Sequence, residues 1–309
     1  MGTNSNDYGR AFEYAFINVL ADDLKQHRNV NLRQDTCYNT SGNAWNTVSA
    51  NLQTDLTNAS KAVLKDLYAL EPNLLSGNDV VELFIQPDTK GELGDVRDIV
   101  VKRGQIKWEI GFSLKHNHFA VKHSRLSPSI DFGDKWYGLP VSQNYWNATQ
   151  PIWDDLRICK ANKITFKSIE PQKPNRFYIP ILNAFLEEIK HACTQNNNVP
   201  RKMVEYLLGM YDFWKMIGID RSKQTELVAF NMHSSLGKNS TILVPVTALP
   251  TAIIGMGLDP QHPDNTAIIS MNNGWSFSFR IHSASTYCEP SLNFDIQIIG
   301  MPTSLLTVV

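Results

Sequence analysis

The first two thirds of the chain carry apolar residues at helical spacing. Phe12, Phe16, Val19, Leu20 and Leu24 recur at intervals of about one turn, which places them on one face of a helix. The same pattern predicts further helices at 43–70, near 142–158, at 178–194 and at 200–217. Residues 1–218 are therefore expected to be mostly helical around one hairpin.

Strands are predicted where apolar and polar residues alternate. Every second residue is apolar from Trp275 to Ile281, and again from Leu292 to Ile298. Further strands are expected at 80–86, 95–101, 105–115, 225–231 and 241–247. The strands at 95–101 and 105–115 form a hairpin, with Gly104 in the left-handed position of its turn. We therefore predict an α+β fold with two parts, a mostly helical one at 1–218 and a β-rich one at 219–309.

Composition and length indicate a globular protein with a large core. The chain has 309 residues, of which 42% are hydrophobic and 19% charged, and this balance excludes disordered and fibrous proteins. No apolar run approaches the roughly 20 residues of a membrane-spanning helix, and no N-terminal pattern marks export. The cysteines lie far apart without a CxxC pair or a disulfide spacing: Cys37, Cys159, Cys193 and Cys288. We therefore expect a cytoplasmic protein with reduced thiols.

Basic residues gather in one segment of an otherwise neutral chain. The formal net charge is −1, which argues against a protein that coats nucleic acid by bulk attraction. Between Arg97 and Arg125, however, seven lysines and arginines stand against two acids. Such a cluster is often only a solvated face. Because this one surrounds two carboxylates in the predicted hairpin, it favours a site for a polyanion.

The second strand of the hairpin has one polar face. Glu109, Gly111, Ser113 and Lys115 alternate with core residues, and Asp98 stands near the start of the partner strand. Carboxylates can hold Mg²⁺ against a scissile phosphate, and a lysine can orient the attacking water. This face therefore favours metal-assisted hydrolysis of phosphodiesters. Periodicity alone also allows a charged face that only meets solvent, but the segment after Lys115 is dense in donors and nearly free of acids.

A third acid is offered by the first helix. Glu13 is in line with Ile17, Leu20 and Leu24, at the edge of the apolar stripe. A carboxylate there loses hydration unless it is paired or binds a metal. The alternative is a side chain that reaches out to solvent beside Arg10.

Four segments together resemble a known family. They are Asp-Tyr-Gly-Arg-Ala-Phe-Glu at 7–13, Gly-Asp-Val-Arg-Asp-Ile at 94–99, Glu-Ile-Gly-Phe-Ser-Leu-Lys-His-Asn-His at 109–118 and Ala-Val-Lys-His-Ser-Arg-Leu-Ser at 120–127. This block resembles the signature of HaeIII-like type II restriction endonucleases. The resemblance implies a PD-(D/E)xK nuclease core, in which helices flank a mixed sheet. It also implies dependence on Mg²⁺ and cleavage of double-stranded DNA at the palindrome GGCC.

The resemblance assigns catalytic roles to three residues. Asp98 matches the first acid of the family motif, and Lys115 matches its lysine. Glu13 matches a first-helix glutamate that is used in parts of the superfamily. The implied nuclease part is residues 1–218, with the catalytic hairpin at 94–118.

The chain departs from the family pattern at Ser113, where an acid is expected two residues before the lysine. The second carboxylate then comes from Glu13, Glu109 or Asp95. Glu109 lies four residues from Ser113, about 13 Å along an extended strand. We therefore predict Glu13 and Asp98 as metal ligands, and keep Asp95, Glu109 and Ser113 as further candidates for the site.

Donors that follow the lysine are candidates for contacts with DNA. They are His116, Asn117, His118, Lys122, His123 and Arg125. Arg125 could hold a backbone phosphate, or it could grip O6 and N7 of guanine with its two-pronged guanidinium. The β-rich residues 219–309 could add a lobe that recognises DNA.

Other assignments follow from the resemblance or stay open beside it. Double-stranded DNA is the expected partner, and a cognate DNA methyltransferase is the implied genetic partner. The chain could act as a monomer or as a homodimer. Two other functions fit the same residues: a structure-specific nuclease for DNA repair or junctions, and a DNA-binding regulator without catalysis.

Overall fold

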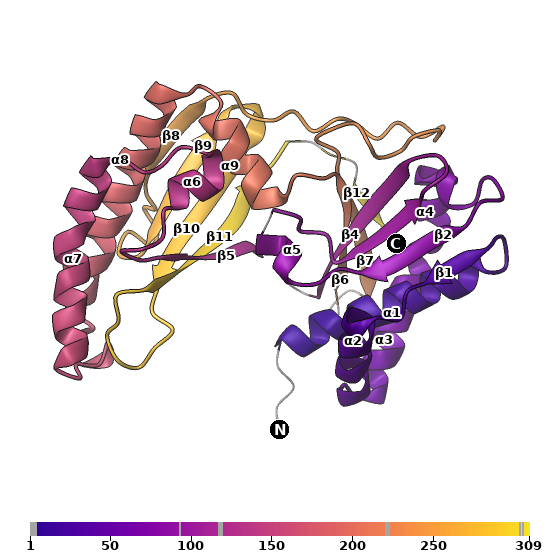
Figure 1. The fold of residues 1–309 in the computed structure, drawn as a ribbon, viewed down its shortest axis with the longest axis horizontal. Coiled ribbons are helices and arrows are strands. Elements are labelled where there is room, and N and C mark those ends of the chain that lie inside the picture. The colour runs from indigo at the N-terminus through magenta and orange to yellow at the C-terminus, as the bar shows by residue number, and fades with distance from the viewer. Residues whose placement is uncertain (1–4, 93, 117–119, 220–222, 303, 305) are drawn as a thin grey trace. The chain divides into compact units, whose positions relative to one another are not determined.

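The computed structural model describes residues 5–92, 94–116, 120–219, 223–302, 304 and 306–309, and it has the expected α+β class. The chain divides into two compact units. The first consists of Met1–His118, Gly209–Thr247 and Thr303–Val309, and the second of Phe119–Leu208 and Ala248–Pro302. Each unit is built on one sheet (Figure 1).

A mixed sheet forms the centre of the first unit. Its strands lie in the order β1 (Val30–Leu32), β2 (Val81–Ile85), β3 (Ile99–Arg103), β4 (Trp108–His116), β6 (Phe213–Ile219), β7 (Gln224–Phe230) and β12 (Leu306–Val308). β1 is parallel to β2, and β4 is parallel to β6. The other neighbours are antiparallel. This is the mixed sheet that the sequence led us to expect.

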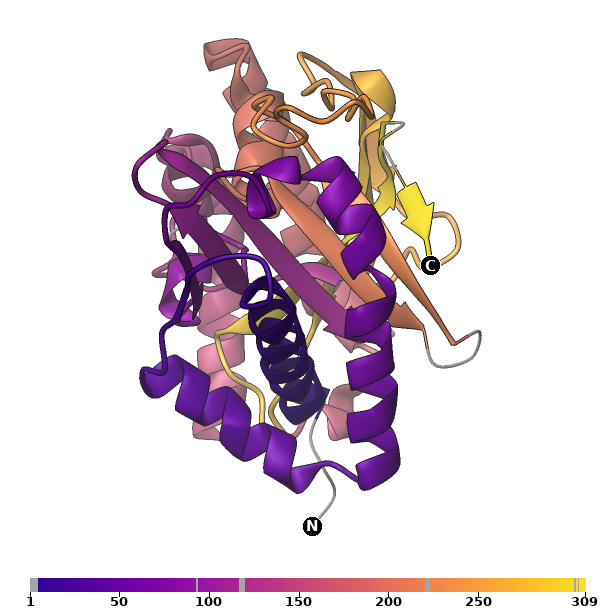
Figure 2. The ribbon, with the colours of Figure 1, turned by 90° about the vertical axis from the view of Figure 1, so that its right-hand side faces the viewer.

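Helices pack against this sheet. They are α1 (Ser5–Leu24), α2 (Thr36–Thr47), α3 (Ala50–Ala62), α4 (Leu64–Leu70), the 3-10 turn η1 (Pro72–Leu74) and α5 (Thr89–Glu92). The expected first helix is confirmed as α1, which lies against β4 (Figure 2). There Phe16 and Phe112 meet edge to face, with ring centroids 4.9 Å apart. The helical structure expected at 43–70 is divided among α2, α3 and α4, and α3 begins where the hydroxyl of Ser49 accepts a hydrogen bond from Leu52 N.

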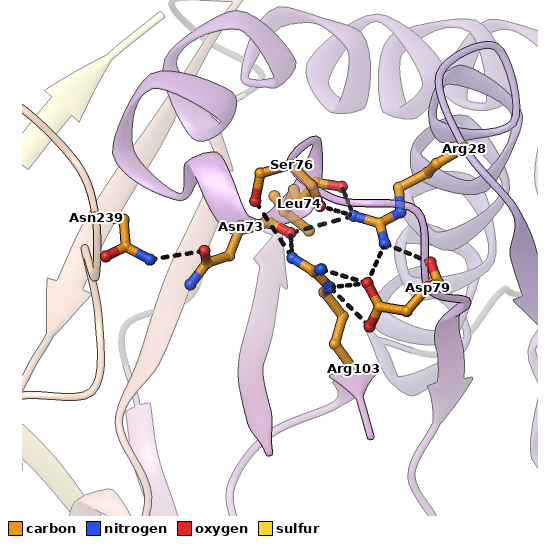
Figure 3. Close-up of polar contacts among 7 residues, drawn as sticks. All are labelled: Arg28, Asn73, Leu74, Ser76, Asp79, Arg103 and Asn239. Atoms are coloured by element: carbon orange, nitrogen blue, oxygen red, sulfur yellow. Dashed lines mark hydrogen bonds and ion pairs between the residues drawn. The ribbon is translucent and has the colours of Figure 1, made fainter. Parts of the chain in front are cut away.

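Two buried arginines tie the end of α1 to the end of β3 (Figure 3). Arg28 follows α1, and Arg103 is the last residue of β3. An Nη atom of Arg28 and Nε of Arg103 each lie 3.0 Å from Oδ1 of Asp79. Both guanidinium groups also donate to backbone carbonyls of residues 73–76. The network therefore fixes α1 relative to β3, the two elements that border the predicted site.

An antiparallel sheet forms the centre of the second unit. Its strands lie in the order β5 (Ala120–Leu126), β11 (Leu292–Gly300), β10 (Ser276–His282), β9 (Thr266–Met271) and β8 (Ile253–Leu258). The alternation expected at 275–281 and 292–298 is confirmed, since Phe277, Phe279 and Phe294 are fully buried.

Helices cover the apolar face of this second sheet. They are α6 (Phe132–Tyr137), α7 (Gln143–Ala161), α8 (Ile179–Gln195) and α9 (Val199–Leu208), with the short turns η2 (Lys167–Ile169), η3 (Pro174–Tyr178) and η4 (Asn272–Gly274). α7 and α8 run side by side (Figure 1). Phe185 of α8 lies 5.2 Å from the ring of Phe279 and 5.0 Å from that of Phe294. Aromatic packing therefore joins the helices to the sheet.

The helix expected at 200–217 is too long. α9 ends at Leu208, and Gly209 has a φ of 104°. A Cβ at Gly209 would lie 3.0 Å from a methyl of Val96 and 3.1 Å from the carbonyl of Gly94, so only glycine fits there. The next residues form β6, which pairs with β7 across the boundary expected at residue 218. The two compact units thus have other bounds than 1–218 and 219–309.

Two smaller expectations are also wrong. Residues 241–247 form no strand and are irregular. In the turn between β3 and β4, the left-handed residue is Lys107, with a φ of 51°, and not Gly104. The hairpin itself is confirmed, with Ile99 opposite Phe112 and Arg103 opposite Trp108.

Candidate active site

Asp98 lies where β3 and β4 part. Its backbone N–H donates to the carbonyl of Phe112 at 2.7 Å. One step further along β4, the N–H of Leu114 donates to the carboxylate of Asp98, also at 2.7 Å. The side chain thus takes the place that a backbone carbonyl would occupy if β3 continued. This bond fixes the carboxylate at the edge of the sheet.

Two side chains of β4 donate to the same carboxylate oxygen. Oγ of Ser113 lies 3.2 Å from Oδ2 of Asp98, and Nζ of Lys115 lies 3.4 Å from it. Both residues are on the polar face that alternation predicted. The acid and the lysine expected from the sequence therefore come together, with Ser113 between them.

Glu13 reaches the same place from α1. Burial raises the pKa of Glu13 to about 8, and the negative charge of Asp98 adds to this shift. A hydrogen bond from Oγ of Ser41 at 3.0 Å and the charge of Lys115 oppose it. Arg10 pairs instead with Asp88, at 2.7 Å. Glu13 therefore faces the site and is not the solvent-directed partner of Arg10.

The two carboxylates could hold one metal ion. Glu13 and Asp98 repel each other when both are charged, and a divalent cation would remove that repulsion. Among the described residues, no cluster of three or more His, Cys, Asp or Glu side chains could hold a metal ion, either at this site or at another. Two carboxylates suit Mg²⁺, which keeps several waters and binds substrate phosphates through its remaining positions. The residues present therefore fit this ion.

Asp95 and Glu109 are held away from this pair by Arg97. Its guanidinium donates to both oxygens of Asp95 and to Glu109, each at 2.8 Å. Burial raises the pKa of both carboxyl groups, but the hydrogen bonds from Arg97 outweigh it and keep each pKa below its usual value. Lys102 adds a second contact to Glu109, at 3.2 Å. Both acids are thus already neutralised by cations of the protein.

Gly111 explains how Arg97 reaches across the strand. A Cβ on Gly111 would lie 1.9 Å from Cδ of Arg97, so the arginine stem rests directly on the glycine. The stem passes between Glu109 and Ser113 on the polar face, and its guanidinium lies 3.9 Å from the ring centre of Tyr211. The small residue on this face therefore admits Arg97.

Lys215 is a further residue of the site, which the sequence did not suggest. It lies on β6 directly beside Ser113 in the parallel pairing of β4 and β6. Burial lowers the pKa of Lys215 to about 8, and the charge of Lys115 adds to the shift, while Asp98 and Glu226 oppose it. The segment had been assigned to a helix, so its alignment with the hairpin was hidden. Recognising Gly209 as a helix end would have exposed it.

The candidates for DNA contacts lie mostly beyond β4. Asn117 and His118 fall outside the described residues, and no side-chain position is described for His116, Lys122 and His123. Arg125 lies on β5 of the second unit, where its Nε donates to Oγ of Ser291 at 2.9 Å. Its guanidinium also lies 3.5 Å from Glu289, and its side chain is 46% exposed. Arg125 is thus accessible and lightly paired.

The chain matches known proteins over nearly its whole length. Residues 9–302 match the family model described as HaeIII restriction endonuclease. The chain is 46% identical over 312 residues to the type II restriction enzyme HaeIII of Haemophilus aegyptius, covering 99% of this chain and 98% of that protein. No solved structure matches the chain. Among the described helices, none is long and apolar enough to cross a membrane. The resemblance seen in the sequence is thereby confirmed, and the chain belongs to the HaeIII restriction endonuclease family, a family of type II site-specific deoxyribonucleases.

Proposed function

We propose that the protein hydrolyses phosphodiester bonds of double-stranded DNA at GGCC with Mg²⁺ as its cofactor. The observation that carries this proposal is the meeting of Asp98, Lys115 and Glu13 at the edge of one sheet. The site GGCC is the one that the family resemblance implies. The high identity to HaeIII along the full chain supports it.

Each residue has a distinct task in this proposal. Asp98 and Glu13 would hold Mg²⁺, and the bound ion would supply polarisation of the phosphoryl oxygen and a lower pKa for a bound water. The hydrogen bonds from Leu114 N and from Ser113 fix the direction of the Asp98 carboxylate. Lys115, 3.4 Å from that carboxylate, orients the attacking water and stabilises the charge that develops on the phosphate.

Contacts with DNA are assigned to the residues that follow the lysine. We assign phosphate contacts near the cut to His116, Asn117, His118, Lys122, His123 and Arg125. The recognition role foreseen for residues 219–309 would fall on the β8–β11 part of the second sheet. A cognate DNA methyltransferase as genetic partner and a cytoplasmic location both fit a restriction enzyme. A homodimer would suit a palindromic site, because a twofold axis relates its halves.

A plasmid digest tests the function. Plasmid of known sequence is incubated with protein and Mg²⁺, beside one plasmid without GGCC and one reaction with EDTA. We expect discrete fragments that end at GGCC, only with Mg²⁺ and only from the plasmid that carries the site. Nicks that depend on branched structure would favour a junction nuclease, and a mobility shift without cutting would favour a regulator.

A further inference from the structure

A second lysine stands in the predicted active site. Lys215 is 9% exposed, and it is the direct neighbour of Ser113 across the parallel strands β4 and β6. Neighbours at one level of a sheet point to the same face, so Lys215 shares the face of Ser113 and Lys115. The next level of the same face carries Lys115, Ile217 and Glu226. Lys215 therefore lies between Ser113 of β4 and Val228 of β7, on the face that carries Lys115.

Among the described residues, Lys215 has no direct anionic partner. In the part of the chain that the structure describes, no hydrogen bond or ion pair joins its ammonium group to another side chain. Asp98 is engaged by Ser113 and Lys115, and Glu226 acts on Lys215 only at a distance. Two lysines on one face repel each other, and burial adds a desolvation cost. An anion placed between them would remove both penalties.

We propose that Lys215 contacts the phosphate that is cleaved, as a second cation opposite Lys115. This inference rests on the proposed nuclease function and adds a residue to its site. The substrate would supply the direct anionic partner that Lys215 does not have among the described residues. Lys215 would bind a non-bridging phosphate oxygen, while Lys115 would orient the attacking water. Stabilisation of the extra negative charge in the transition state makes Lys215 a catalytic residue.

Replacement of Lys215 separates this role from a structural one. Lys215→Met keeps the length of the stem and removes the charge, so it should leave the melting temperature unchanged or raise it. In single-turnover cleavage of a GGCC duplex, the same variant should lose on the order of 100-fold in rate. Lys215→Arg keeps the charge and should retain more activity than Lys215→Met. Lys223→Met, in the turn directly before β7, is the matched control, since Lys223 is 64% exposed and pairs with Asp55.

A modified duplex tests the contact itself. Binding is measured without Mg²⁺ on GGCC duplexes that carry one neutral methylphosphonate, moved step by step across the site. If Lys215 touches a phosphate, Lys215→Met weakens binding to the unmodified duplex but not to the one whose contacted phosphate is neutral. Equal weakening on every duplex would overturn the contact. A rate within about twofold of wild type in Lys215→Met, or a lower melting temperature, would overturn the catalytic role.

The two proposals fail in different ways. If the wild-type protein does not cut GGCC DNA, the proposed function is wrong, whatever the variants do. If the wild type cuts and Lys215→Met cuts equally well, only the assignment of Lys215 is wrong. A normal rate in Lys223→Met is required in either case, because that residue lies outside the site.

Discussion

Ser113 occupies the place where the family pattern has an acid, and its hydroxyl donates to Asp98 at 3.2 Å. A hydroxyl brings no negative charge, so a second carboxylate has to come from another element. Glu13 is the one that faces Asp98, and its pKa near 8 means that it keeps a proton at neutral pH until a cation displaces it. The sequence could suggest Glu13 as the second carboxylate, because Glu13 lies at the edge of an apolar stripe. It could not choose Glu13 over Asp95 and Glu109, because that choice depends on the ion pairs that Arg97 forms with those two acids.

Substitution of the two glutamates tests which one binds the metal. Glu13→Gln should raise the Mg²⁺ concentration needed for half-maximal cutting by on the order of tenfold, because one of two anionic ligands is lost. Glu109→Gln is the matched control and should change that concentration little, since Arg97 and Lys102 already neutralise Glu109. The measurement is a Mg²⁺ titration of the cleavage rate. A larger effect in Glu109→Gln would move the second ligand onto β4.

At the scale of elements, some helices and strands can be predicted from the sequence and others cannot. α1 carries an apolar stripe, and β4 alternates apolar core residues with Glu109, Ser113 and Lys115, so the periodicity of both was visible and their prediction is confirmed. β6 lies in the middle of the sheet, and every residue from Phe213 to Gly218 is buried. Such a strand shows no alternation. One continuous helix was therefore predicted, from the helical spacing of Met203, Leu207, Met210 and Trp214.

Glu71, which accepts a hydrogen bond from Trp214 of β6, should make the stability of the protein depend on pH. Burial raises the pKa of Glu71 to about 7, against hydrogen bonds from Gly237 N at 2.8 Å and from the indole of Trp214 at 2.9 Å. The protonated form stabilises the fold fully below pH 4.5, and this contribution is lost as the pH rises towards 7. Glu71→Gln stays neutral at every pH. Its free energy of unfolding relative to wild type should therefore rise by about 3 kcal/mol between pH 4 and pH 8.

Urea unfolding of both proteins across this pH range measures that difference. The glutamine retains an oxygen that can accept from Gly237 and Trp214, so the comparison changes the charge and little else. A difference that stays constant with pH would show that Glu71 is ionised in the folded protein.

The ion pairs of Arg28 and Arg103 with Asp79 should also stabilise the folded protein. Asp79→Asn removes the only carboxylate that the described residues place between Arg28 and Arg103, and it leaves two buried cations facing each other. Loss of one partner from a buried ion network is strongly destabilising. We expect a melting temperature lower by about 5–10 °C in a scanning calorimeter. Asp22→Asn on the exposed side of α1 should leave it unchanged, and equal melting of both variants would contradict the role of the network.

At the scale of the whole molecule, the units are assembled from segments far apart in the chain. The first sheet takes β4, then β6 after 96 intervening residues, and finally β12 near residue 309. The second sheet joins β5 to β11 in the same way. Local patterns predict elements but not such distant pairings. For this reason the division at residue 218 followed the change in composition, whereas the compact units follow the pairing of strands.

Arg125 tests the recognition of DNA by the assembled protein. It is 46% exposed and only lightly paired with Glu289, so it is free to exchange that acid for a phosphate. Arg125→Ala should weaken binding about equally on GGCC and scrambled duplexes, and lower the salt slope by about one unit. The measurement is a salt titration of binding to both duplexes. A loss confined to GGCC, of about 1–3 kcal/mol, would instead make Arg125 a reader of guanine.

The most direct test of the proposed active site is single-turnover cleavage by Asp98→Asn. The amide oxygen can still accept from Leu114 N, so the edge of the sheet is preserved while the negative charge of the proposed metal ligand is lost. We predict melting and binding to GGCC DNA close to wild type, with a cleavage rate lower by about three orders of magnitude. Asp22→Asn is the control and should cut normally. Cleavage by Asp98→Asn at the wild-type rate would contradict the active site described here.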